Sequence, residues 1–174
     1  MEKKLAIRRM IGTGMQADKI ILAATTAPGD SDYQRRLRLW GADCAAHAAH
    51  LMRASRQQKE GHAAINGARL YARAFYNDAM LMVFDCPPGS QLYEATKKDS
   101  FSPASEARLA AALCAQKNVW TGALGASTHA RRAISHQKDE AGAQLQASVD
   151  ELGWQVGRLL LWLCEPEPRD WPVG

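Results

Sequence analysis

The residues most suited to catalysis or metal binding lie in the stretch LRLWGADCAAHAAHLM, which holds an aspartate, a cysteine and two histidines within eight positions. On a helix, Asp43 and His47 lie four residues apart and can touch, so they could form half of a metal site or an acid–base pair. His50 points away from His47, and the chain contains no Glu-x-x-His sequence, so the signatures of helical metal sites are missing. We therefore expect His47 to be a boundary residue hydrogen-bonded to Asp43 above a core of Trp40 and Cys44, with no metal bound.

Two other groups of residues suggest chemistry. Arg69 and Arg73 lie four apart on an expected helix and could clamp a carboxylate or a phosphate, although such a pair is more often part of a solvated face. His129 follows a serine and a threonine, but adjacent residues on a helix do not face each other, and the chain has no nucleophile elbow. We therefore assign no catalytic residue and no cofactor.

The composition is that of a globular domain. The chain has 174 residues, of which 47% are hydrophobic and 23% are charged. The formal net charge is +4, and the basic residues are spread along the chain with no run of five or more. This pattern argues against a nucleic-acid partner and favours a neutral or acidic protein surface.

The sequence shows no membrane-spanning segment, secretory leader or disulfide pattern, and these features bear on where in the cell the protein is located. The longest apolar stretch near the C-terminus, residues 159–164, is too short to span a bilayer, and the N-terminus lacks the apolar core of a secretory leader. The four cysteines are widely spaced, which fits neither a zinc knuckle nor a disulfide framework. We expect a protein of the reducing cytoplasm with no membrane partner.

Alanine, the strongest helix former, accounts for 31 of the 174 residues, and no strand-length alternation of apolar and polar residues stands out. The sequence therefore predicts an all-α fold of about five helices in an antiparallel bundle or compact helical array. From the apolar spacing and the breaker residues, we expect helices at 3–27, 31–55, 60–84, 102–136 and 138–165.

The helices fall into one main unit. Residues 1–29 are expected to form an N-terminal helical segment with breaks at Gly12 and Gly14. Residues 30–165 form the helical domain, and residues 166–174 form a tail.

The helix expected at 102–136 has the clearest start. Ser102 can cap it, and Pro103 suits its first turn. Gly122 and Gly125 predict a bend within this helix, without ending it.

Two segments resemble a known family. Leu-Arg-Leu-Trp-Gly-Ala-Asp-Cys-Ala at 37–45 and Ala-Ile-Asn-Gly-Ala-Arg-Leu-Tyr-Ala-Arg at 64–73 are similar to motifs of the "immunity protein five-like" family of bacterial polymorphic toxin systems. The similarity covers residues 36–80. The resemblance implies an alanine-rich helical protein with no assigned catalytic residues and with a protein partner, the cognate toxin.

The leading hypothesis is therefore a non-enzymatic protein-binding module, an immunity protein that neutralises a bacterial toxin by occluding it. The alternative is a helical-bundle enzyme, or a small-molecule or metal-binding protein, with a site near Asp43, His47 and His129. The oligomeric state stays open. For the leading hypothesis, the expected partner contacts combine the two recognisable helices with polar side chains: Asp43, His47, Arg69, Tyr71 and Arg73.

Overall fold

A computed structural model describes residues 16–26, 31–53, 55–74 and 102–164. All elements within these ranges are helical, which confirms the predicted all-α fold. None of the described helices is both long and apolar enough to cross a lipid bilayer. The elements are α2 (Ala17–Thr26), α3 (Ser31–Ala48), the short 3-10 helix η1 (Ala49–Leu51), α4 (Ser55–Ala74), α7 (Pro103–Cys114), α8 (Val119–Ser135) and α9 (Ala141–Cys164).

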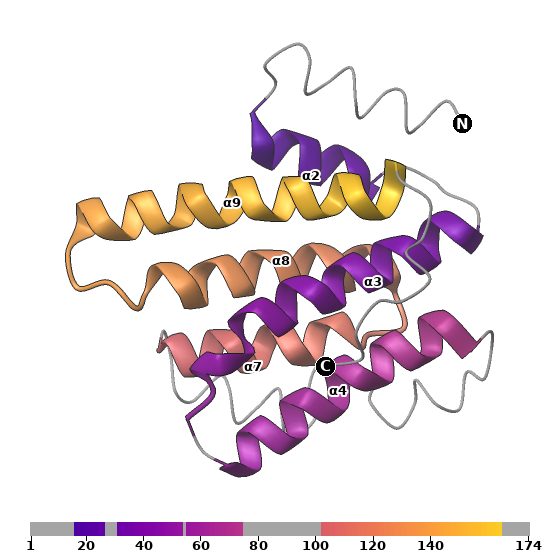
Figure 1. Cartoon of the computed structure of the whole chain (residues 1–174), viewed down its shortest axis with the longest axis horizontal. Coiled ribbons are helices and arrows are strands. Elements are labelled where there is room, and N and C mark those ends of the chain that lie inside the picture. Colours follow the sequence, from indigo (N-terminus) through magenta and orange to yellow (C-terminus); the bar gives the residue numbers. More distant parts are fainter. Residues whose placement is uncertain (1–15, 27–30, 54, 75–101, 165–174) are drawn as a thin grey trace.

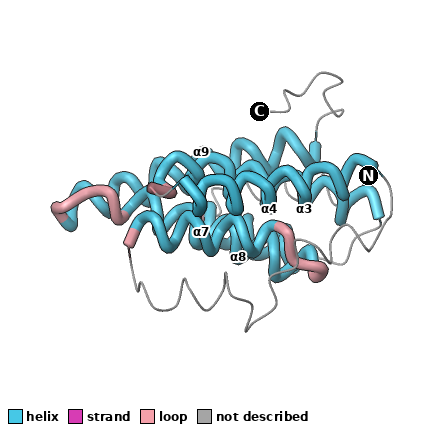
Figure 2. The backbone as a smooth tube through the Cα atoms, turned by 90° about the horizontal axis from the view of Figure 1, so that it is seen from below, coloured by secondary structure: helices cyan, strands magenta, loops and turns pink. Residues whose placement is uncertain are grey.

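The helices are arranged around α8. This helix contacts α7, α9, α3 and α2, and Figure 1 shows α7, α8 and α9 side by side with α3 crossing them obliquely. In the view of Figure 2, α3 and α4 form a layer over α7 and α8. The array is therefore compact, as predicted.

Small residues let the helices approach one another closely. The buried apolar residues of α7 and α8 are mostly alanines. A Cβ atom added to Gly41 on α3 would lie 3.0 Å from the Cα atom of Ala123 on α8. A Cβ atom added to Gly122 would lie 2.7 Å from the carbonyl oxygen of Leu113 on α7. A side chain at Gly122 would therefore force the backbones of α7 and α8 apart, and one at Gly41 would press tightly against Ala123. The larger buried side chains fill the space around the alanines: Leu37, Leu39, Trp40, Met52, Ile65, Leu159 and Leu163.

The single helix predicted at 102–136 is two helices in the structure, α7 and α8. Its start is confirmed, because the Ser102 hydroxyl accepts a hydrogen bond from the Ser105 amide at 3.1 Å. The predicted continuity is wrong, because the chain turns after α7 and begins a new helix. Asn118 stabilises that new start, since its side chain accepts hydrogen bonds from two amides of α8 at 3.1 and 3.3 Å. The glycines expected to bend the helix lie inside α8.

The boundary between the second and third predicted helices also differs. α3 ends at Ala48 and continues as the 3-10 helix η1, and α4 begins at Ser55, five residues before the predicted start at 60. α9 lies within three residues of its predicted bounds at both ends. The part of the third predicted helix beyond residue 74 lies outside the described residues.

The N-terminal segment is described only from residue 16 onward. α2 lies within the predicted segment and buries Ile20, Ile21 and Ala24 in the same core as the other helices. The expected breaks at Gly12 and Gly14, and the tail at 166–174, lie outside the described residues.

Candidate functional site

Asp43 lies at the meeting point of three helices. It is 4% exposed, and its carboxylate accepts hydrogen bonds from side chains on α4 and α9. The Arg69 Nη2 atom lies 2.9 Å from Oδ1, while the Arg158 Nε and Trp162 Nε1 atoms lie 2.9 and 2.8 Å from Oδ2. Each oxygen is thus engaged by a charged donor, which is what a buried carboxylate requires. Asp43 therefore links α3 to both α4 and α9.

His47 pairs with a different carboxylate from the one predicted. Its Nδ1 atom lies 2.8 Å from Oε2 of Glu151 on α9, and its ring stacks on Trp154 with the centroids 4.0 Å apart. The predicted hydrogen bond between His47 and Asp43 is therefore wrong, because the nearest partners of both side chains come from other helices. His50 is exposed, and its Nδ1 atom lies 3.0 Å from the carbonyl oxygen of His47.

The Glu151 carboxylate belongs to a second buried group of hydrogen bonds. Its Oε1 atom accepts from Gln155 Nε2 at 3.0 Å, and the same nitrogen donates to the carbonyl oxygen of Ser127 at 2.9 Å. The indole nitrogen of Trp40 donates to the carbonyl oxygen of Gln155 at 2.9 Å. These bonds connect α9 to both α8 and α3.

A third polar pair joins α7 to α8. The Glu106 carboxylate is buried, and its Oε2 atom lies 2.6 Å from Nδ1 of His129. Burial raises the pKa of Glu106, but the hydrogen bond and positive charge of His129, together with nearby Arg132, outweigh it and bring the pKa below its ordinary value. His129 is thus held by α7, separately from Asp43 and His47.

These geometries favour structural roles for Asp43, His47 and His129, the residues that could have taken part in catalysis or metal binding. Among the described residues, no three His, Cys, Asp or Glu side chains are placed to hold a metal ion together. Burial raises the pKa of the Cys44 thiol well above its ordinary value, and the negative charges of Glu151 and Asp43 raise it further. The Cys44 thiolate, the form that acts as a nucleophile, is therefore disfavoured.

Of the predicted contact residues, Asp43 is buried, His47 is exposed, and Arg69, Tyr71 and Arg73 are partly buried. Asp43 is buried and the Arg69 side chain, 15% exposed, is bound to it, so a protein that docks onto this structure would not reach that carboxylate. The His47 side chain is 42% exposed. The Tyr71 ring lies 5.0 Å from the guanidinium carbon of Arg38, and Arg73 is partly buried. The favoured expectation of a solvated face is wrong for Arg69, whose side chain is mostly buried and bound to Asp43. The alternative, a clamp for an external anion, would need Arg69 to leave this carboxylate.

The partners of these groups on α9 were not predicted from the sequence. Glu151, Gln155, Arg158 and Trp162 follow one another at spacings of four, three and four residues, so they share one face of the helix. A polar row at this spacing on an otherwise apolar helix is the signal that could have revealed them.

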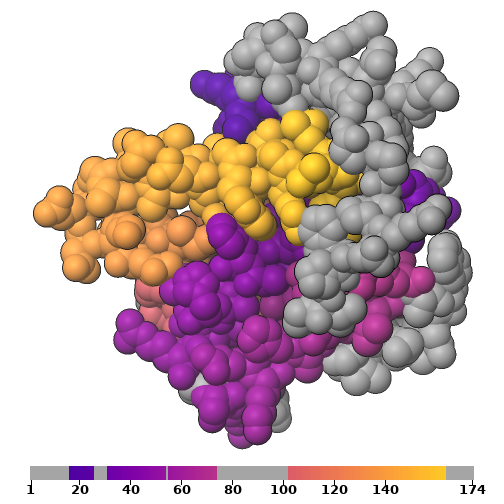
Figure 3. All heavy atoms as spheres, in the orientation of Figure 1, coloured from indigo at the N-terminus to yellow at the C-terminus, as the bar shows by residue number. Residues whose placement is uncertain are grey.

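The exposed apolar residues of α9 have the opposite character, and they follow a ridge that winds by about 160° around the helix from Leu145 to Leu161. Leu145, Val149 and Leu161 are exposed by 68%, 53% and 46%. They lie at multiples of four residues, and Gly153 and Gly157 fill the two positions between them, with no atom within 4 Å of an added Cβ. These five residues, called here the α9 row, carry no charge. Figure 3 shows α9 at the surface of the molecule over much of its length.

Comparison with protein-family models, curated proteins and solved structures finds no match to this chain. The resemblance to the immunity family therefore stays a prediction, and the functional argument depends on the residues themselves.

Proposed function

We propose that this protein is a non-enzymatic, cytoplasmic protein-binding module whose α9 row docks against a separate protein. The observation that carries the proposal is the run of exposed, uncharged residues along that helix. Neutralisation of a bacterial toxin by occlusion is the specific form of this function that the sequence resemblance favours.

The α9 row has the energetic character of a docking surface. Burying a Leu or Val side chain contributes about 1.5–3 kcal/mol, so covering the neighbouring Leu145 and Val149 would supply several kcal/mol to a complex. Exposed apolar residues are ordinary when scattered, but Leu145 and Val149 are neighbours on one side of α9, about 40° apart around the helix axis. Leu161 lies about 160° around the axis from Leu145, so Leu145, Val149 and the adjacent Gly153 form the part of the row that a single partner surface can cover.

The two glycines of the row support the same proposal. Glycine inside a helix is about 1 kcal/mol less favourable than alanine. At Gly153 and Gly157 the space left by the missing side chain is open, so no packing within the described part of the chain explains them. A partner backbone can approach α9 closely at this point.

The chemistry of the row sets the chemistry of the partner. Because its five members are uncharged, the partner should present an apolar helix or flat apolar surface at the contact. The polar groups of Asp43, Glu151 and Glu106 already bond between helices, which favours a binding role over a catalytic one.

The test uses the product of the neighbouring gene as the candidate partner, co-expressed and purified with this chain. Val149→Lys should weaken the complex by about 10- to 100-fold in titration calorimetry, from the lost burial of one side chain. Leu70→Lys is the matched control, because Leu70 is 50% exposed and lies on α4. It should change the affinity less than about twofold.

Other outcomes of these measurements would contradict the proposal. Equal weakening by both variants, or no weakening by Val149→Lys, would exclude the α9 row as the docking surface. If the wild type self-associates in sedimentation and Val149→Lys abolishes this, the partner is a second copy of the chain and the proposal of a separate protein is wrong.

A further inference from the structure

A hollow of about 210 Å³ lies where α2, α8 and α9 meet. All three helices contribute apolar side chains to its wall, and these are Ile21, Leu22, Leu124 and Leu152. Among its described lining residues, the charged side chains are one acid and one base, Asp18 and Arg131. Because these two formal charges cancel, apolar contact is the main attraction that the wall offers to an occupant.

Helix α2 shows what α8 and α9 accept at this position. It packs against both helices, and its Ile20, Ile21 and Ala24 side chains are buried. Asp18, in the first turn of α2, lines the hollow, so the hollow lies at the start of this helix. Figure 1 shows that α9 extends well beyond this end of α2. α2 therefore covers only part of the length over which a helix could lie on α8 and α9.

The pairing of α8 with α9 continues past the start of α2. Gln155, which lines the hollow, donates from Nε2 to the carbonyl oxygen of Ser127 at 2.9 Å. Eleven residues earlier on α9, the carbonyl oxygen of Gln144 accepts a hydrogen bond from the Ser135 hydroxyl on α8, also at 2.9 Å. Eleven residues span about 16 Å of helix, so α8 and α9 lie side by side over this whole distance.

Apolar side chains on α9 continue the wall of the hollow in the same direction. Leu145 lies seven residues before Leu152, which places it about 10 Å along the axis and only about 20° around it. Val149 lies about 60° around the axis from Leu152. Leu145 and Val149 are 68% and 53% exposed, so most of their surface is open to a partner. The hollow together with these two side chains is called here the α8–α9 groove.

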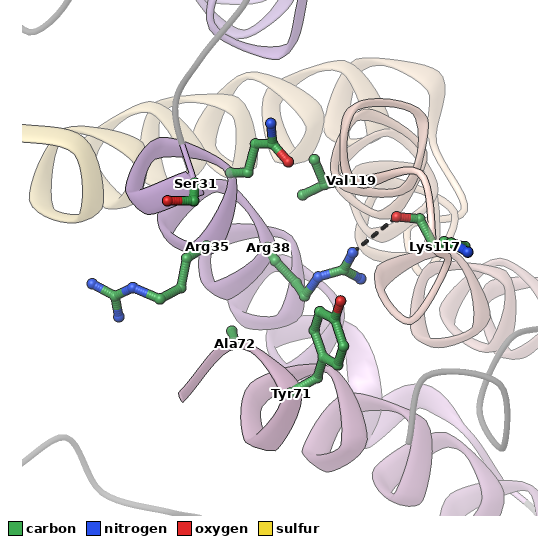
Figure 4. A pocket seen from close by; sticks show the side chains of 8 residues that line it. Ser31, Arg35, Arg38, Tyr71, Ala72, Lys117 and Val119 are labelled. Atoms are coloured by element: carbon green, nitrogen blue, oxygen red, sulfur yellow. Dashed lines mark hydrogen bonds between the residues drawn. The ribbon is translucent and has the colours of Figure 1, made fainter. Parts of the chain in front are cut away.

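The cavity where α3, α4 and the turn before α8 meet has a different character (Figure 4). Polar and charged side chains form most of its described lining. One of them, Arg38, donates from Nη1 and Nη2 to the carbonyl oxygens of Gln116 and Lys117 at 2.7 and 3.1 Å. An apolar helix would gain little at such a wall, so the α8–α9 groove is the better seat for one.

We infer that the α8–α9 groove receives an apolar α-helix of the partner protein, which lies in line with α2 and makes contact over about two turns. Its side chains would fill the hollow between Leu22 and Leu152 and cover Leu145 and Val149. Helices pack in this way, with the side chains of one inserted into the groove of another. This inference rests on the proposed function, and it selects a helix over the flat apolar surface that the α9 row alone would also accept.

The experiment uses the purified product of the neighbouring gene as the partner, titrated with the full chain. Thr128 lines the hollow from α8 and is partly buried. Thr128→Lys places a long charged side chain in the groove and should weaken the complex at least about tenfold. Thr121→Lys is the matched control, because Thr121 is exposed on the same helix two turns away and does not line the hollow. It should change the affinity less than about twofold, and circular dichroism establishes that both variants are folded.

The outcomes separate this inference from the proposed function. Weakening by Val149→Lys without weakening by Thr128→Lys would show that the partner covers the α9 row from outside the groove, so the inference would be wrong and the proposed function would stand. If neither variant weakens the complex, both are wrong. Equal weakening by Thr128→Lys and Thr121→Lys would also overturn the inference.

A second measurement does not depend on the folding of the Thr128→Lys variant. Leu22 lines the hollow from α2 and is 51% exposed, so a photoreactive benzoylphenylalanine can replace it. In the purified complex it should capture one segment of the partner, which peptide mass spectrometry identifies. Proline at a polar position inside that segment should weaken binding at least about tenfold, because proline breaks a helix, and alanine there less than about twofold. Capture of this chain alone, or equal effects of proline and alanine, would overturn the inference.

Discussion

Replacing Asp43 with asparagine tests whether the buried carboxylate stabilises the helix array. The substitution keeps the side-chain shape but removes the charge that accepts three hydrogen bonds. Removing one partner of a buried ion pair typically costs about 3–5 kcal/mol. The Arg69 and Arg158 side chains are 15% and 23% exposed, so water screens their unpaired charges and reduces the loss of stability. We expect Asp43→Asn to lower the free energy of unfolding by about 3 kcal/mol.

The assay is urea unfolding followed by circular dichroism, supported by thermal melting. For a domain of this size, 1 kcal/mol corresponds to about 2–4 °C, so the melting temperature should fall by about 6–12 °C. Asp150→Asn is the control, because Asp150 is exposed on α9 and accepts from Gln146. It should cost less than about 0.5 kcal/mol. An effect of Asp43→Asn no larger than this control would refute a structural role for the buried carboxylate.

Three further predictions concern pH, thiol reactivity and helix packing. Because the folded-state pKa of Glu106 is lowered, its pair with His129 contributes stability above the ordinary glutamate pKa, and this is lost as the pH falls through the folded value. Urea midpoints measured from neutral to acidic pH should therefore fall less steeply in Glu106→Gln than in the wild type. Cys44 should resist iodoacetamide in the native protein and become labelled in urea, as peptide mass spectrometry would show, because burial disfavours its thiolate. Gly122→Ala should destabilise the protein by about 1–3 kcal/mol through its clash with α7, whereas Gly153→Ala should stabilise it by up to about 1 kcal/mol in the same unfolding assay.

The helices were predictable from the sequence where local signals were strong. The bounds of α9 follow from the apolar spacing before the proline-rich end, and Ser102 caps α7 as its position predicts. The turn between α7 and α8 was not predictable in this way. Residues 115–118 contain no glycine or proline, so Asn118, which caps α8, is the local sign of a new helix, and a long-range contact at the turn comes from Arg38, about 80 positions earlier, which binds its carbonyl oxygens.

The hydrogen-bond partners of Asp43 and His47 could not be predicted for a related reason. Asp43 and His47 have the spacing of a local pair, and the sequence offers no sign that other helices compete for them. In the structure the partners of Asp43 come from 26 and 115 residues away, at Arg69 and Arg158. Charged donors from neighbouring helices satisfy a buried carboxylate better than a partly exposed imidazole on the same helix.

The alanine-lined contacts between the helices have a consequence for alignment along the helix axes. At Gly41 and Gly122 the close contacts fix α8 against α3 and α7, because a slide of one helical turn, about 5.4 Å, would bring a side chain to each contact. The bonds from Asp43 to Arg158 and Trp162 on α9, and from His47 to Glu151, fix α3 against α9 in the same way because they form at a single offset. A redesign that replaced these polar residues with apolar ones of equal volume could keep the fold's stability and lose its unique register.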